Sequence, residues 1–377
     1  MVLRNSSSQN ETSRLPLRIG TASELSISAD RIVAFYLAQF QRRLAVSVSE
    51  FYDWQFLRTP AGNSDNCIVA LDEDRNKIAG VLGVTARPFH LIAISRNAAE
   101  LTTWLVADDY RSTGVGASMI TLALSRFDAL VALGVTDFSI PVFLRSGFRQ
   151  LRAIPRFTRI FDIEALATIA TISPLSRKLA PIYRASRSIS LTERVAEPED
   201  FSGLFDRMDR KYNFFVRDPS HLLWRYRRHP VFSYRIFHIA SGDGEAMVVV
   251  RDERSIPGLN ILHVVDCIGD DEAMPGAFSF IDTLCTREDT HMADFFCTAD
   301  RINKHAIAAG WFSALDDTHL RVPHLFHPVS LRDPSTTSLV YWSRHNMTEM
   351  SDRSCLYVTK QDIDFDRPVP NSQGEWT

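Results

Sequence analysis

Apolar positions divide the middle of the chain into short segments with different periods. Residues 101–107 form an apolar run of strand length, and the segment after them carries apolar side chains at helical spacing. Gly134 stands where a left-handed residue would end that helix, and apolar runs at 135–140 and 156–163 predict two further strands. The helical face consists of Met119, Ile120, Ala123, Leu124, Phe127 and Val131. The predicted order is therefore strand, turn, helix, strand, short helix (142–148) and strand.

A second pattern is a repeat of a longer arrangement. Residues 54–60, Trp-Gln-Phe-Leu-Arg-Thr-Pro, return 170 positions later as residues 224–230, Trp-Arg-Tyr-Arg-Arg-His-Pro. Each copy follows a helix-like segment and precedes a hairpin-like stretch, an apolar strand and a helix, which the second copy places at 261–268 and 277–285. Self-similarity at a fixed offset is typical of duplicated folds, so we expect two tandem copies of one fold.

The duplication divides the chain into four parts. Residues 1–14 are polar and serine-rich and are expected to form a disordered tail. Residues 15–164 form the first copy, residues 165–190 a connector, and residues 191–377 the second copy with a C-terminal extension. A chain of 377 residues of which 45% are hydrophobic is long enough to bury two cores.

Composition argues against several classes of function. The formal net charge is −3 and no basic run extends beyond residues 225–228, so nucleic-acid binding is not expected. No apolar run reaches membrane length, so no membrane partner is expected. Five cysteines, an odd number without Cys-x-x-Cys spacing, indicate a reducing compartment, and we expect a cytoplasmic protein. The pair His324 and His327 lies among prolines in a predicted loop, so no metal site is expected.

The turn between the 101–107 strand and the following helix contains a Gly-x-Gly pair, Gly114 and Gly116. Glycines let a backbone come close to a ligand, and the N–H groups at a helix N-terminus attract an anion. A Walker loop would need Gly-Lys-Ser/Thr, and a dinucleotide fingerprint would need a third glycine or alanine. Neither pattern is present, so the turn predicts a phosphate site of another kind.

Val106, Arg111, Gly114 and Gly116 fit Val-x-x-x-x-Arg-x-x-Gly-x-Gly, which resembles the acyl-CoA signature of the GNAT acyltransferase superfamily. The resemblance implies a tandem GNAT fold of the α/β class, with mixed central sheets flanked by helices. It also implies that acyl-CoA is the co-substrate, with its pyrophosphate on the turn and its pantetheine arm along the preceding strand. The implied binding residues are Leu105, Val106, Arg111, Ser112, Thr113, Gly114, Val115, Gly116 and Ala117.

This sequence departs from the family pattern in chemically relevant places. Many family members carry a tyrosine in the short helix that protonates the departing thiolate, whereas this chain has Phe143. Asp108 replaces a consensus proline. The second copy carries Asp-Asp-Glu-Ala-Met-Pro-Gly at 270–276 in place of the glycine turn, and carboxylates there would repel a pyrophosphate. Acyl-CoA is therefore expected to bind only the first copy.

Two carboxylates are candidates for the general base that an amine acceptor requires. Glu100 lies at the start of the 101–107 strand, where some members of the resembled family place their base; the alternative is a solvated residue at a strand end. Asp266 follows the apolar residues 261–265, and the alternative there is an ion pair with an arginine.

The C-terminal extension contains predicted strands at 338–342 and 355–359, expected to complete the second sheet, followed by Asp-Ile-Asp-Phe-Asp-Arg-Pro at 362–368. That ending lacks the glycine and closing glutamate of a calcium loop. It resembles the ending of tandem GNAT proteins associated with bacterial surface polysaccharide synthesis, whose acceptors are nucleotide-linked amino sugars. Its acidic side chains would bind sugar hydroxyls or the amine, and a solvated charged tail is the alternative.

Together these features predict an N-acyltransferase that moves an acyl group from CoA to a primary amine, with a nucleotide-linked amino sugar as the leading acceptor. A related peptidyltransferase that uses aminoacyl-tRNA is one alternative, although it would need a basic surface. A non-catalytic CoA-binding module is the other, favoured by Phe143. The acyl chain, the acceptor and the oligomeric state are left open.

Overall fold

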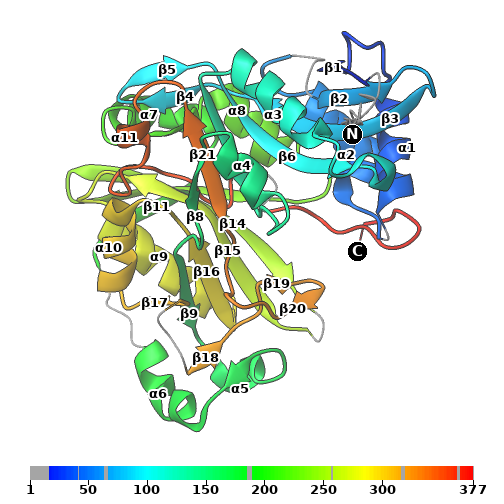
Figure 1. Ribbon diagram of the computed structural model, residues 1–377. Coiled ribbons are helices and arrows are strands. Elements are labelled where there is room, and N and C mark those ends of the chain that lie inside the picture. Colours follow the sequence, from blue (N-terminus) through cyan, green and yellow to red (C-terminus); the bar gives the residue numbers. More distant parts are fainter. Residues whose placement is uncertain are drawn as a thin grey trace, which may run out of the picture.

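The fold is described from a computed structural model of residues 1–377. It describes residues 17–40, 42–62, 67–184, 189–255, 258–315, 319–362 and 366–376. The expected disordered tail, residues 1–14, lies outside this part of the chain. Two seven-stranded mixed sheets dominate the described residues, one in the upper and one in the lower part of the molecule in Figure 1.

The first sheet has the strand order β1-β2-β3-β6-β7-β21-β8. Its central neighbours β6 and β7 run parallel, and the other neighbours run antiparallel. Apolar side chains from both strands and helices fill its core. The strands are β1 Leu17–Thr21, β2 Cys67–Asp72, β3 Lys77–Ala86, β6 Ala98–Val106, β7 Ala129–Leu133, β21 Leu339–Ser343 and β8 Arg149–Leu151.

The second sheet repeats this plan in the order β11-β13-β14-β15-β16-β9-β17. Here β15 and β16 are the parallel pair. The strands are β11 Thr192–Val195, β13 Arg235–Ser241, β14 Gly244–Arg254, β15 Asn260–Gly269, β16 Met292–Phe296, β9 Arg156–Ile160 and β17 Phe312–Ser313. The two sheets therefore share one topology, as the sequence repeat predicts.

Helices occupy matching places in the two halves. The first half has α1 Ala29–Gln39, α2 Ser49–Tyr52, α3 Val115–Arg126 and α4 Ile140–Arg145. The second half has α7 Ser202–Met208, α8 Pro219–Leu222, α9 Met274–Arg287 and α10 Asp300–Ala308. The helices α5 Ile163–Leu166, at the boundary of the connector, and α6 Pro174–Arg184, within it, lie at the bottom of Figure 1. Helix α11 Met347–Met350 follows β21. Short strands complete the set: β4 Phe89–Leu91, β5 Ile94–Arg96, β10 Thr171–Ile172, β12 Phe214–Phe215, β18 Leu320–Arg321, β19 Leu325–Phe326 and β20 Val329–Ser330.

The two halves exchange one strand each. The strand β9 belongs to the first half in sequence, yet it pairs with β16 and β17 of the second sheet. In return β21, from the C-terminal extension, lies between β7 and β8 of the first sheet. The expectation that residues 338–342 complete the second sheet is therefore wrong. The expected division into 15–164 and 191–377 stays a prediction, and these two strands do not follow it.

Two other expectations about local structure are wrong. The helix α3 ends at Arg126, and residues 129–133, Ala-Leu-Val-Ala-Leu, form β7, whereas 135–140 form a turn and the start of α4. A short continuous apolar run fits a buried strand and a buried helix equally well, so periodicity misplaced this boundary. Residues 355–359 form isolated bridges at Leu356 and Thr359, with no regular strand.

A tryptophan pair joins the two copies of the repeat. Trp54 and Trp224 each lie in a π-helical turn, Asp53–Leu57 and Leu223–Arg227, so the repeated sequences also share their conformation. The two indole rings stack at 4.7 Å with an interplanar angle of 12°. Each indole N–H donates to the other residue's backbone carbonyl, at 3.2 Å from Trp54 and 3.0 Å from Trp224. The two tryptophans are therefore related to each other by an approximate local two-fold axis.

We expect Trp224→Ala to lower the free energy of unfolding by about 3–5 kcal/mol, because it removes a large buried ring from a packed junction. Trp224→Phe keeps a ring but loses one hydrogen bond, and should cost less. Urea unfolding followed by circular dichroism measures both. Phe138→Ala is the control, since Phe138 is 95% exposed and its truncation should change stability by less than about 0.5 kcal/mol. Equal losses for Trp224→Ala and the control would contradict a stabilising role for the pair.

Candidate functional site

The glycine turn has the backbone of an anion site. After β6 the chain makes one 3₁₀ turn, Asp108–Tyr110, and then reaches α3, whose N-cap is Gly114. Gly114 has φ +89° and Ser112 has φ +63°, so two residues of the turn are left-handed. The side chain of Arg111 is exposed and pairs with Asp108 at 2.8 Å. Residues 111–114 are exposed, which leaves the N-terminus of a twelve-residue helix open to solvent.

Positions 114 and 116 require glycine for different physical reasons. A Cβ on Gly114 would meet nothing within 4 Å, so only its positive φ requires glycine. A Cβ on Gly116 would lie 2.7 Å from Cζ2 of Trp104, so this glycine makes room for the indole ring. Gly116 thus packs against the chain's own side chain, and its part in binding a ligand stays a prediction.

Strands β6 and β7 separate before they reach this turn. They pair only from Ala98–Leu101 to Ala129–Ala132, while β6 continues to Val106. Thr103, at the point of separation, has φ +43°, and the register between β3 and β6 shifts there. The outer part of β6, including the candidates Leu105 and Val106, thus continues without β7 beside it.

The second half repeats this arrangement, and the C-terminal segment lies beside the outer part of its strand. Strands β15 and β16 pair only over 261–264 and 292–295, and β15 continues to Gly269. The amide of Gln361 donates to the carbonyl of Val265 at 3.1 Å, and the amide of Cys267 donates to the Tyr357 hydroxyl at 3.2 Å. The outer part of β15 is therefore covered by the chain itself.

The turn of the second half is also held differently. Asp270 pairs with Arg207 at 2.9 Å and with Lys211 at 3.2 Å, and Asp271 pairs with Lys304 at 3.3 Å. A Cβ on Gly276 would lie 2.7 Å from Cβ of Ser241, so this glycine serves packing. The acidic residues that replace the glycine turn are thus used in ion pairs within the fold.

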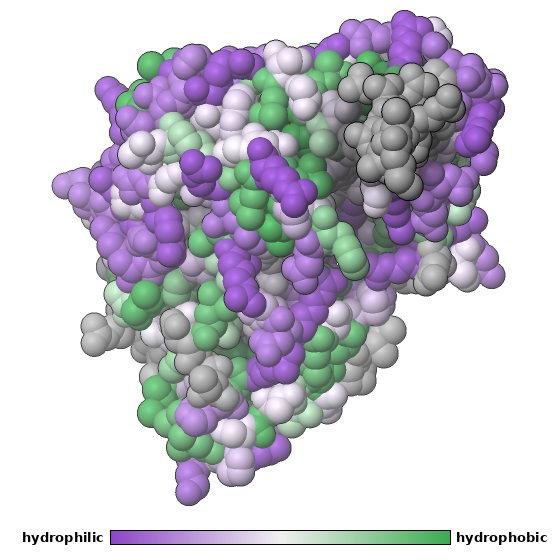
Figure 2. All heavy atoms as spheres, viewed as in Figure 1, coloured by the Kyte–Doolittle hydropathy of each residue, from purple (hydrophilic) through white to green (hydrophobic). Residues whose placement is uncertain are grey.

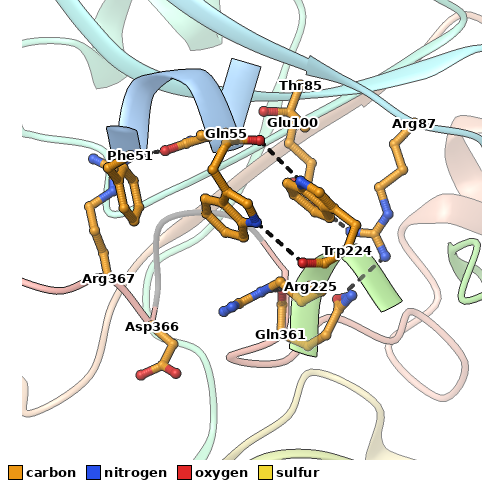
Figure 3. A pocket seen from close by; sticks show the side chains of 11 residues that line it. Phe51, Gln55, Thr85, Arg87, Glu100, Trp224, Arg225, Gln361, Asp366 and Arg367 are labelled. Atoms are coloured by element: carbon orange, nitrogen blue, oxygen red, sulfur yellow. Dashed lines mark hydrogen bonds and ion pairs between the residues drawn. The ribbon is translucent and has the colours of Figure 1, made fainter. Parts of the chain in front are cut away.

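A pocket of about 350 Å³ lies where the two halves meet the C-terminal segment (Figure 3). The first half contributes residues of α2, its π-helical turn, β3 and β6, the second half contributes the start of its π-helical turn, and the C-terminal segment closes one side. The pocket is lined by Phe51, Trp54, Gln55, Thr85, Arg87, Glu100, Trp224, Arg225, Gln361, Asp366 and Arg367. A second pocket of about 580 Å³ shares Thr85, Arg87 and Trp224 with it.

Glu100 lines this pocket and is buried, with 3% of its surface exposed. The alternative of a solvated residue at a strand end is therefore wrong. Arg87 donates to its Oε1 atom at 2.8 Å and also pairs with Asp362 at 3.3 Å. Burial lowers the pKa of Arg87, and the charges of Glu100 and Asp362 oppose that shift.

Asp266, the second candidate base, is fully buried in an ion pair. Arg217 donates to its Oδ2 atom at 2.7 Å, and the Tyr357 hydroxyl donates to Oδ1 at 2.5 Å. Asp266 does not line either of the two pockets described above. The ion-pair alternative fits this placement, so the structure brings Glu100 to the pocket and keeps Asp266 apart from it.

The acidic ending is buried, so the alternative of a solvated tail is wrong for its described part. Asp362 pairs with Arg217 at 2.9 Å, and Asp366 pairs with Arg251 at 2.6 Å. Asp364 lies outside the described residues. Sequence reasoning missed Arg367, which donates at 3.0 Å to the hydroxyls of Thr102 and Thr103 on the β6 bulge.

Phe143 is buried against two aromatic rings and leaves no hydroxyl at the position of the family's tyrosine. Its ring lies edge-on to Phe148 at 4.9 Å and to Trp104 at 5.2 Å. The indole N–H of Trp104 is buried and, among the described residues, has no hydrogen-bond partner. On the surface, hydrophobic side chains gather over the region of α3 and α4 in Figure 2, where Phe138 and Leu144 are exposed.

Comparison with family models matches residues 30–148 to the Acetyltransferase (GNAT) family. The match covers this segment alone, about a third of the chain. The matched segment contains the glycine turn, β6 and Glu100, whereas Asp266 and the acidic ending lie outside it. Comparison with curated proteins finds no match.

Solved structures extend the fold comparison along the chain. A GCN5-related N-acetyltransferase from Anabaena variabilis ATCC 29413 matches with a TM-score of 0.55 at 14% identity, over 88% of this chain and 74% of that chain. Saccharomyces cerevisiae N-myristoyltransferase with bound myristoyl-CoA matches at 0.48 and 11%, over 86% and 82%. A GCN5-related N-acetyltransferase from Kribbella flavida matches at 0.47 and 15%, over 74% and 63%. The first match shows that the GNAT fold extends beyond residues 30–148.

The described residues contain neither a cluster of metal ligands nor a membrane-spanning helix. No three His, Cys, Asp or Glu side chains among them gather as a metal site would require. None of their helices is long and apolar enough to cross a bilayer.

Two buried histidines make the free energy of unfolding depend on pH. Burial lowers the pKa of His229, beside the tryptophan pair, to about 2, and that of His324 to about 3. An unfolded histidine titrates near pH 6.5, so below that pH the unfolded chain binds protons that the folded chain does not. The contribution of these two histidines to the free energy of unfolding is therefore complete above pH 6.5 and is lost as the pH falls below it.

We expect the free energy of unfolding to fall by about 2 kcal/mol per such histidine between pH 7 and pH 5. His229→Asn, whose side-chain oxygen can accept the Val231 and Phe232 amides that now donate to Nδ1, should remove one such contribution. Urea unfolding at both pH values measures the difference. His345→Asn, at an exposed position, is the control. Equal pH dependence in the parent and His229→Asn would contradict this account.

Proposed function

We propose that the protein is an acyl-CoA-dependent N-acyltransferase that transfers an acyl group to a primary amine bound between its halves. The observation that carries the proposal is the position of Glu100. It lies on β6, in the pocket between the two halves, on the strand that leads through a bulge to the glycine turn. One strand thus links a candidate donor site to a candidate base.

The donor site we propose consists of Leu105, Val106 and the turn from Arg111 to Ala117. Three features support it: the open helix N-terminus, the left-handed Gly114, and the separation of β6 from β7. The turn would hold the pyrophosphate, and the outer part of β6 would bind the pantetheine arm. The covered outer part of β15 in the second half supports a single donor site.

The base we propose is Glu100, which would take a proton from the acceptor amine as its nitrogen attacks the thioester carbonyl. Its ion pair with Arg87 holds the carboxylate in one orientation. Because Phe143 has no proton to give, the thiol of CoA would leave as the thiolate or take its proton from water. Asp266, locked in its ion pair with Arg217, is proposed as a positioning residue for the C-terminal segment.

The acceptor we propose as the leading candidate is a nucleotide-linked amino sugar, a choice that rests on the resemblance of the acidic ending. The pocket beside Glu100 and the adjoining pocket of about 580 Å³ would together receive the acceptor. The acidic residues of the ending are not proposed as sugar ligands, because Asp362 and Asp366 are held by arginines.

The donor site is tested with Ala117→Glu. Ala117 is exposed in the first turn of α3, where a glutamate suits the helix dipole but repels a bound pyrophosphate. Thermal unfolding with and without acetyl-CoA should show a stabilised parent and an unresponsive variant, each with an unchanged midpoint in the absence of ligand. Ser125→Glu, about 12 Å further along the helix, should respond like the parent. No shift of the parent at saturating CoA would contradict the donor site.

The base is tested with Glu100→Gln. We expect kcat to fall by roughly 10²–10⁴ while the thermal shift with acetyl-CoA remains, because the amide accepts no proton but keeps the shape of the side chain. Release of CoA thiol, measured with a chromogenic thiol reagent, follows the reaction. An unchanged rate would remove Glu100 from the mechanism. CoA binding without transfer in the parent to any amine offered would favour the non-catalytic module.

A further inference from the structure

Arg225 differs from the other buried arginines around the pocket. Arg87 is paired with Glu100, Arg217 with Asp266, and Arg251 with Asp366. Arg225 lines the pocket and is only 3% exposed, yet no carboxylate of the described residues lies within ion-pair distance of it. The repeat emphasises this difference, because the matching residue of the first copy is the uncharged Gln55.

The fold uses only part of the hydrogen-bonding capacity of Arg225. Its Nε donates to the carbonyl of Gln361 at 3.1 Å, and its Nη1 donates to the Tyr234 hydroxyl at 2.8 Å. A guanidinium carries five N–H groups. Three therefore remain, one on Nη1 and two on Nη2, without a partner among the described residues. Neighbouring N–H groups of a guanidinium form a planar fork that matches a carboxylate or a phosphate.

The surroundings keep Arg225 charged without neutralising it fully. The rings of Tyr234 and Trp54 lie 5.1 Å and 5.9 Å from its guanidinium carbon and stabilise a cation. Burial opposes the charge, but Tyr234 and Asp366 together raise the pKa of Arg225. The Tyr234 hydroxyl donates a hydrogen bond of 2.9 Å to Asp366, which also accepts hydrogen bonds from Arg251. A buried cation with this residual capacity is stabilised by an anionic ligand.

We propose that Arg225 binds an oxyanion, either a carboxylate or a phosphate, on the same small moiety of the acceptor that carries the amine. The inference rests on the proposed acyltransferase function and narrows its acceptor class. Figure 3 shows Glu100 and Arg225 on different sides of one pocket, so one side would receive the amine and the other the anion. The pocket is narrow, which places both groups on one compact moiety.

The test compares amines that differ only in the oxyanion, with acetyl-CoA as donor and thiol release as readout. One arm pairs glycine, alanine, serine and glutamate with their α-amides. The other arm pairs glucosamine 1-phosphate and glucosamine 6-phosphate with glucosamine. In at least one pair we expect kcat/KM to be about tenfold or more higher for the anionic member, the usual effect of a hydrogen bond to a charged group. The arm in which the preference occurs separates a carboxylate from a phosphate.

Arg225→Gln should remove that preference. The acceptor KM should rise about tenfold or more for the anionic member, with little change for its uncharged partner and none in the KM for acetyl-CoA. Arg228→Gln is the matched control, because Arg228 is exposed in the same repeat motif. Arg225→Lys keeps the charge but loses the fork, and should retain part of the preference even if the glutamine variant folds poorly.

The outcomes separate three points: the oxyanion site, the role of Arg225 and the acyltransferase function. Equal use of charged and uncharged acceptors by the parent would overturn the oxyanion site while leaving the acyltransferase intact, and this comparison needs no variant. Equal losses on both members of a pair in Arg225→Gln would overturn the role of Arg225. No transfer to any probe would contradict the acyltransferase proposal itself.

Discussion

The exchange of one strand between the two sheets is the constraint on which the rest of this structure depends. Each sheet is completed by a strand from the other half of the sequence, β9 in one direction and β21 in the other. Backbone N–H and C=O groups inside a sheet must be paired, so neither sheet reaches its full set of strands alone. The reciprocal bonds of Trp54 and Trp224 hold the same junction at a second point. A pocket built from both halves is thereby held in one geometry.

The duplication separates two roles that a single copy would have to combine. In both sheets one of the two parallel central strands continues without the other beside it, β6 beyond β7 in the first and β15 beyond β16 in the second. In the second half Tyr357 and Gln361 cover the outer part of β15, and the same segment then continues to the pocket of the first half. The second copy thus anchors the chain that forms one side of the pocket. In the proposed function it supports the acceptor site and does not bind the donor.

Charge pairing explains why so many polar side chains can be buried at this junction. Removing a charge from water is costly unless a partner and hydrogen bonds replace the solvent. Arg217 meets this requirement twice, with Asp266 on β15 and Asp362 in the C-terminal segment. Each such pair joins elements that are distant in sequence and fixes the course of the C-terminal segment. Among the described residues Arg225 departs from this rule, and in the proposed function a ligand in the pocket provides the missing partner.

The sequence by itself determined the features that depend on neighbouring residues. The glycine turn, the helix after it, the repeat around Trp54 and Trp224, and the place of Glu100 near the start of a strand were all predictable, because turn chemistry and apolar spacing act locally. The boundary between α3 and β7 was missed, since five consecutive apolar residues suit either state. Only the tertiary structure decided which sheet β21 completes, that Glu100 is buried beside Arg87, and that Arg225 has no carboxylate partner in the described part of the chain. These properties depend on contacts between residues far apart in the chain, and neither spacing nor composition specifies such contacts.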